Sequence, residues 1–176
     1  MKFLRLPPWT YNHSAPAFTL IECCLVVALL GLMMFLTGAQ SLFLHRLLVR
    51  TELEHLYTTC YYLQRKAMIT QQPQKLILQP DTNSYSYNGT CYSLPTHVRF
   101  GCPDGAQGPP AHPATVITKP ITFINNAISF APSGVMQAGT AYLIDRNGIH
   151  GYALSCAVAQ VSYLRKYQYN GQWEQI

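Results

Sequence analysis

The longest apolar stretch of the chain, residues 18–44, constrains its fold more than any other feature. Its 27 residues contain one charged side chain, Glu22. At about 1.5 Å per residue, a helix of this length reaches about 40 Å, which exceeds the roughly 30 Å hydrocarbon core of a bilayer. Lys2 and Arg5 precede the stretch, and positive residues before a first helix hold that end in the cytoplasm. The sequence therefore predicts a transmembrane helix, with the rest of the chain outside the cytoplasm.

The short segment before this stretch predicts a processed precursor. A secretory signal peptide has an apolar stretch of about 7–15 residues followed by its cleavage site, whereas here the small residue Ala17 precedes a longer stretch. Cleavage between Ala17 and Phe18 would keep the helix and give Phe18 a free amine. An acid in an apolar helix usually has a partner, so we expect Glu22 to pair with this amine, within one subunit or between neighbouring subunits. The alternative is a lone acid stabilised by the helix dipole.

Residues 17–22, Ala-Phe-Thr-Leu-Ile-Glu, resemble the start of the type IV pilin and pseudopilin superfamily. The resemblance implies that a prepilin peptidase cuts before Phe18 and methylates its amine, and that Glu22 serves assembly. Two positions depart from the family pattern. Ala17 replaces the glycine that usually precedes the cut, and Cys23-Cys24 replaces leucines.

A second helical pattern follows the apolar stretch. Apolar residues recur at spacings of three and four, which predicts an amphipathic helix with one stripe covered by a folded domain. No proline lies between Pro16 and Pro73, so one continuous helix of about 55 residues is permitted. The residues of the stripe are Val49, Leu53, Leu56, Cys60, Leu63 and Ala67.

The chain after Pro73 predicts mostly strands joined by turns. Three Asn-Gly pairs, at 88–89, 147–148 and 170–171, predict hairpins, and residues 101–113, with four prolines and three glycines, predict an exposed loop. Strands are expected at 75–79, 84–87, 90–94 and 141–145, with a turn at 80–83.

The predicted fold class is α+β. A long N-terminal helix, with a transmembrane half and an amphipathic half, packs on a C-terminal β-sandwich or pair of antiparallel sheets. The predicted parts are a cleaved leader (1–17), a transmembrane and assembly helix (18–44), its amphipathic continuation (45–72) and a globular β-rich domain (73–176).

The C-terminal half resembles the H-type minor pseudopilins of type II secretion and the related FimT-like minor pilins. The resemblance is carried by residues 128–134, 142–144 and 161–166, although Leu164-Arg165 replaces the closing glycine-arginine of the family. It implies a minor subunit that is first a single-pass inner-membrane protein with a periplasmic domain and then part of a pilus or pseudopilus. The implied partners are other minor and major pilins, prepilin peptidase, the inner-membrane assembly platform and membrane lipid.

DNA binding for uptake is the alternative that the FimT-like resemblance leaves open. Removal of Lys2 and Arg5 with the leader lowers the formal net charge from +5 to +3, which is a weak excess for a nucleic-acid binder. Arg165 and Lys166, flanked by tyrosines, are the candidate DNA contacts. The alternative for this pair is a charged strand that protects a sheet edge. A more distant alternative for the whole chain is a single-span membrane protein that does not polymerise.

Four cysteines lie in the part predicted to be exported, where disulfides form. Cys91 and Cys102 lie near turns, and we expect a disulfide between them, whereas Cys60 and Cys156 are expected to be buried thiols. The seven acidic residues are scattered, and no phosphate-binding loop or nucleophile motif occurs. We therefore expect no enzymatic activity, no cofactor and no metal site.

Overall fold

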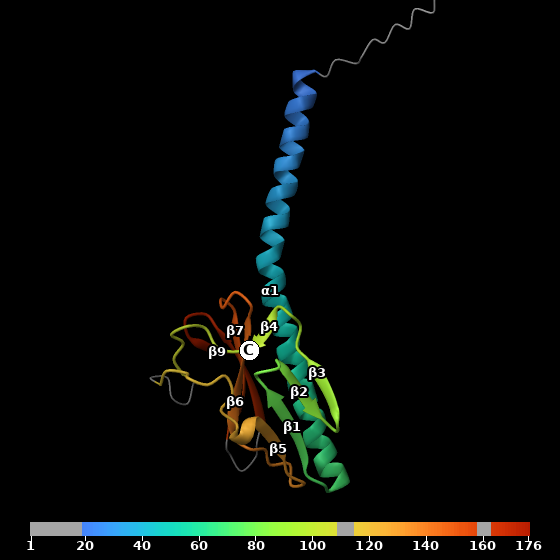
Figure 1. Ribbon diagram of the computed structural model, residues 1–176, viewed down its shortest axis with the longest axis vertical. Coiled ribbons are helices and arrows are strands. Elements are labelled where there is room, and N and C mark those ends of the chain that lie inside the picture. The colour runs from blue at the N-terminus through green and yellow to red at the C-terminus, as the bar shows by residue number, and fades with distance from the viewer. Residues whose placement is uncertain (1–18, 109–114, 158–162) are drawn as a thin grey trace, which may run out of the picture. The chain divides into compact units, whose positions relative to one another are not determined.

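The computed structural model describes residues 19–108, 115–157 and 163–176, without the side chains of residues 36–43 and 157. Its helix α1 (Leu20–Thr70) contributes to two compact units. The first unit ends at Gln40, and the second runs from Ser41 and contains all the strands (Figure 1). The fold and the pocket described below belong to the second unit.

The fold class predicted from the sequence is wrong, because it required a long apolar helix with a transmembrane half. The side chains of α1 are described in two shorter helical stretches, residues 20–35 and 44–70. Neither stretch is long and apolar enough to cross a membrane. The second carries six charged residues.

The strands form two antiparallel sheets. The four-stranded sheet has the order β3-β2-β1-β5, and the five-stranded sheet has the order β4-β6-β7-β8-β9. The first contains β1 (Gln74–Gln79), β2 (Ser84–Tyr87), β3 (Thr90–Ser93) and β5 (Ala127–Phe130). The second contains β4 (Val98–Phe100), β6 (Gly139–Asp145), β7 (Gly151–Ala157), β8 (Tyr163–Tyr169) and β9 (Trp173–Gln175).

The three predicted Asn-Gly hairpins are confirmed. Asn88 and Gly89 have φ values of 51° and 79° and form the two-residue connection between β2 and β3. This is the backbone that a tight hairpin turn requires, and asparagine and glycine adopt it with little strain. Residues 147–148 lie in the connection between β6 and β7, and residues 170–171 lie in the connection between β8 and β9.

The amphipathic stripe of α1 is buried, as predicted. Its six residues from Val49 to Ala67 are at most 1% exposed, and they share one core with side chains from both sheets. Leu76 of β1 and Leu154 of β7 are members of this core. Helix 44–70 is therefore an integral part of the second unit, because its apolar face closes the core.

A long connection covers the other face of the five-stranded sheet. Cys102 and Ile117 from this connection pack on Tyr142 and Tyr167, and Trp173 packs there as well. The chain then returns to the edge of β6, where residues 120–122 lie in line with β4. There the backbone N–H of residue 142 donates to the carbonyl oxygen of residue 120, and the backbone N–H of residue 122 donates to the carbonyl oxygen of residue 140, both at 2.9 Å. This return positions the pocket described below.

Candidate functional site

The N-terminus of α1 is closed by a capping box formed by Thr19 and Glu22. The Thr19 backbone N–H and hydroxyl donate to Glu22 Oε2 at 2.8 and 2.9 Å. In return, the Glu22 backbone N–H donates to the Thr19 hydroxyl at 3.4 Å. This reciprocal arrangement satisfies backbone groups that a helix start leaves open. The hydrogen bonds from Thr19 lower the pKa of Glu22, so the carboxylate is charged at neutral pH.

The predicted partner of Glu22 lies outside the described residues. Ala17 and Phe18, the predicted cleavage site, are in that part of the chain, so their geometry relative to Glu22 is not part of the structure. Both bonds from Thr19 reach Oε2, and no partner of Oε1 is recorded among the described residues. Within the described part of the chain, Oε1 of Glu22 therefore accepts no hydrogen bond.

The helical stretch that follows exposes apolar side chains on all sides. Eleven large apolar residues between Leu20 and Phe35 are 49–82% exposed in the isolated chain. One face is hollowed, because the small residues Cys23, Cys24 and Ala28 lie there beside larger neighbours. A surface of this kind indicates an interaction site, since soluble monomers rarely expose large apolar patches.

The two candidate DNA contacts, Arg165 and Lys166, lie on opposite faces of β8. Lys166 pairs with Leu154 in register and faces the core that contains α1. Its ammonium lies 2.6 Å from Glu54 Oε1 and 2.9 Å from Oε2, and 4.8 Å from the centroid of the Tyr57 ring. The guanidinium of Arg165 lies 4.5 Å from the ring centroid of Tyr163, its neighbour but one on β8. The side chains of Arg165 and Lys166 therefore lie on different faces of the sheet, and the charge of Lys166 is neutralised by Glu54.

The disulfide predicted between Cys91 and Cys102 is not present in the structure. Cys91 lies exposed on the edge strand β3, Cys102 lies half-buried in the covering connection, and both are free thiols. The Cys102 thiol lies 3.9 Å from the carbonyl oxygen of Ile117, and burial raises its pKa. Within the described ranges, no group of three histidine, cysteine or acidic side chains is arranged to hold a metal ion.

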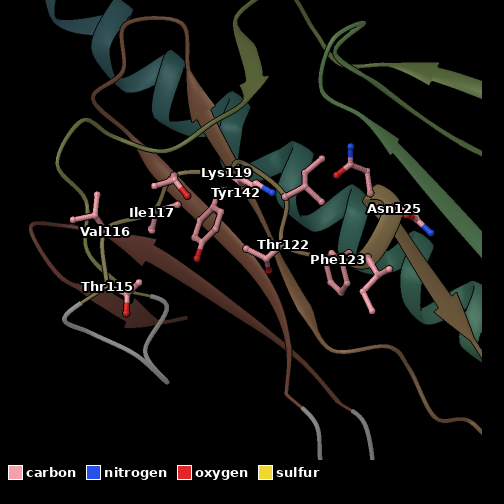
Figure 2. Close-up of a pocket in the computed structure, with 13 residues that line it drawn as sticks. Thr115, Val116, Ile117, Lys119, Thr122, Phe123, Asn125 and Tyr142 are labelled. Atoms are coloured by element: carbon pink, nitrogen blue, oxygen red, sulfur yellow. The ribbon is translucent and has the colours of Figure 1, made fainter.

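A pocket of about 460 Å³ lies beside the return of the covering connection to β6 (Figure 2). Its wall is formed by residues 115–126, apart from residue 120, together with Gly108 and Tyr142. Five of these residues are Val, Ile or Phe, and the others include three threonines, Lys119 and the neighbouring Asn125 and Asn126. Both asparagines have positive φ values, 55° and 51°, which turn the chain sharply at this corner.

The pocket suits a small ligand with apolar and polar parts better than it suits catalysis. Among its lining residues, only Lys119 and Tyr142 are ionisable. Burial raises the pKa of Tyr142 to about 12, so its hydroxyl stays protonated at neutral pH. The lining residues include no carboxylate, imidazole or thiol, which are the usual groups for general acid–base or nucleophilic chemistry.

The sequence did not predict this pocket. Its residues come from an irregular segment and from one strand position, and only the folded connection brings Tyr142 next to residues 115–126. The adjacent asparagines were the one local signal, because asparagine is the non-glycine residue best suited to positive φ.

The comparisons with known proteins add no relative. No protein-family model matches the chain, and neither the curated proteins nor the solved structures gave a match.

Proposed function

We propose that this chain is a pilin-like subunit that assembles through the helical stretch 20–35. It would be trimmed before Phe18 by a prepilin peptidase and would enter a type IV pilus or a type II secretion pseudopilus as a minor component. The observation that carries the proposal is the contrast within α1. The stripe from Val49 to Ala67 is buried by the chain's own core, whereas the large apolar residues from Leu20 to Phe35 are exposed.

The exposed stretch has a surface suited to other helices. Burial of a single Leu, Ile or Val side chain contributes about 1.5–3 kcal/mol, so lateral packing of several of these residues would stabilise an assembly. Small residues at a helix interface let backbones approach closely, and Cys23, Cys24 and Ala28 supply such a face. We infer that the occupant of this face is the corresponding stretch of neighbouring subunits.

Glu22 fits this proposal in two ways. One carboxylate oxygen caps its own helix, and the other is open to the amine that cleavage before Phe18 would create. Since Glu22 is the only charged residue between 18 and 44, the sides of the helix stay apolar and suitable for lateral packing. A charge at the helix start would then set the register between neighbouring subunits.

Assembly is the stronger of the two functions considered from the sequence. DNA binding would need Arg165 and Lys166 to present charge on one accessible face. Lys166 is instead bound to Glu54, and Arg165 lies on the opposite face of β8. We therefore propose a secretion or pilus subunit in preference to a DNA receptor.

The test is filament incorporation of three variants in cells with an active prepilin peptidase, measured in sheared filament fractions. Glu22→Gln keeps an oxygen that can cap the helix but removes the charge, and we expect it to be absent from the filaments. Thr19→Val removes the cap hydroxyl but keeps the charge, and we expect it to be incorporated. Val27→Asn places an amide in the proposed interface at a cost of about 1–3 kcal/mol, which corresponds to about a 5- to 150-fold loss of incorporation.

The control for surface polarity is Ile69→Asn, because Ile69 is an equally large residue that is 81% exposed on the other stretch of α1. It should be incorporated at the wild-type level. The proposal is refuted if Glu22→Gln and Val27→Asn both enter filaments as wild type does, or if the wild-type protein keeps its leader in these cells.

A further inference from the structure

We propose that Cys60 of α1 and Cys156 of β7 form a disulfide that joins the helix to the five-stranded sheet. Nothing in the local sequence pairs these residues, which are 96 positions apart. The structure holds both side chains as thiols, and its geometry places them on facing surfaces of the same core. The proposal does not depend on the function proposed above.

Both cysteines point into the core between α1 and the sheets. Cys60 is 0% exposed and Cys156 is 3% exposed, and both belong to the main hydrophobic cluster. Cys156 shares its strand face with Leu154 and Tyr152, because side chains alternate along a strand, and these two residues are in the same cluster. Ala153, on the opposite face, belongs to the other cluster.

Lys166 fixes the position of α1 over this face of the sheet. It contacts Glu54 and Tyr57 on the helix, and it pairs in register with Leu154 on β7. Two residues further along β7 is Cys156, at a distance of about 6.7 Å. A helix covers the same distance in four to five residues, at about 1.5 Å each. Counted from residues 54–57, this distance reaches the region of residue 60 on α1.

A second contact fixes the direction of that advance. The ring centroids of His45 on α1 and His97 lie 5.2 Å apart, and the His97 carbonyl accepts a hydrogen bond from the backbone N–H of Arg146, directly after the end of β6. Because the end of β6 pairs with the start of β7 at Gly151, the helix runs from the His45 contact to the Lys166 contact in the same direction as β7 runs from Gly151 to Leu154. In this direction Cys60 follows the Lys166 contact on the helix, and Cys156 follows Leu154 on β7.

The electrostatics agree with this placement. Burial raises the pKa of the Cys60 thiol well above its ordinary value, and the neighbouring Cys156 raises it further. The two thiols therefore lie within electrostatic reach of one another. Cysteine is also small, so it lets a helix approach a sheet closely, and a disulfide needs Cα atoms within about 7 Å.

The oxidant would be another disulfide, either on a protein or on a small molecule such as oxidised glutathione. A thiolate of one cysteine attacks that disulfide and forms a mixed disulfide, and the second cysteine then displaces the bound thiol. The two cysteines lose two protons and two electrons, and the oxidant is reduced to two thiols. Since both residues are buried in the folded domain, the exchange must occur before α1 packs on the sheet.

The experiment is a disulfide map of the full-length chain after refolding in a glutathione redox buffer, where the result is independent of cellular location. Free thiols are alkylated in denaturant, and the protein is digested with trypsin without reduction. Cleavage gives four peptides with one of the exported cysteines each: residues 51–65, 76–99, 100–146 and 147–165. Each pairing therefore has its own mass. We expect a linked peptide of residues 51–65 with 147–165.

Two sets of variants make the result decisive. Cys91→Ser with Cys102→Ser should leave the linked peptide unchanged, and the reducing agent should still lower the unfolding temperature. Cys60→Ser with Cys156→Ser should abolish the linked peptide and make the unfolding temperature insensitive to reductant. The proposal is overturned if the peptides 51–65 and 147–165 are both alkylated in the wild-type protein, or if either is linked to another cysteine.

Discussion

Replacement of Leu63 by alanine tests whether helix 44–70 is part of the domain core. Leu63 is 0% exposed and lies in the cluster that joins α1 to both sheets. The substitution removes buried methyl groups and leaves a cavity, because the surrounding side chains relax only in part. A Leu→Ala change at such a site costs about 2–5 kcal/mol of stability.

This loss is large for a domain of this size. Globular domains are stable by about 5–15 kcal/mol, so Leu63→Ala would remove a substantial fraction of the total. With a urea dependence of about 1–3 kcal/mol per molar, the unfolding midpoint should fall by roughly 1 M or more. Unfolding is followed by far-ultraviolet circular dichroism of the full chain in mild detergent.

Ile69→Ala is the matched control. It lies six residues further along the same helix, has a side chain of the same volume and is 81% exposed. A change at an exposed site away from special features alters stability by about 0.5 kcal/mol or less. If Leu63→Ala and Ile69→Ala shift the midpoint equally, the packing of α1 against the sheets is refuted, and with it the description of helix 44–70 as a core element.

Two further predictions concern the polar groups between α1 and the sheets. A double-mutant cycle of Glu54→Gln and Lys166→Met, measured by urea unfolding, should give a coupling energy of about 0.5–1 kcal/mol, since the pair is partly exposed. A coupling energy of zero would contradict a stabilising ion pair between these two residues. Burial raises the pKa of Tyr85 to about 12, so folding favours its neutral form. Stability from this source is present below the unfolded pKa of about 10 and is lost as the pH rises toward about 12. Tyr85→Phe should therefore flatten the fall of the urea midpoint across that window, and an unchanged slope would contradict the assignment.

Local signals in the sequence predicted the parts of the fold that depend on neighbouring residues. The Asn-Gly pairs predicted the hairpins because the glycine of each pair, and at the first pair also Asn88, adopts the positive φ that such turns require. The spacing from Val49 to Ala67 gave the buried stripe of α1, because a period of three and four residues places these side chains on one helix face. Both inferences need no knowledge of the rest of the chain.

Contacts between distant parts of the chain were beyond local reasoning. Glu54 and Lys166 are 112 positions apart, and nothing near Lys166 indicates that a helix residue neutralises it. The strand alternation that separates Arg165 from Lys166 could have been applied to the sequence, and it would have weakened the idea of a joint basic site. The pocket beside Tyr142 depends on the path of an irregular connection, for which the sequence holds no periodic signal.

The two stretches of α1 carry apolar side chains of the same types, but their surroundings differ. In helix 44–70 the chain's own sheets cover one stripe, and the opposite face is polar enough for water. In helix 20–35 the large apolar side chains are exposed in the isolated chain, so this stretch leaves apolar surface in contact with water. The capping box of Thr19 and Glu22 favours the helical state but cannot replace lateral packing. Burial of these side chains should therefore stabilise this stretch of α1, so that the contacts that cover it also join one subunit to the next.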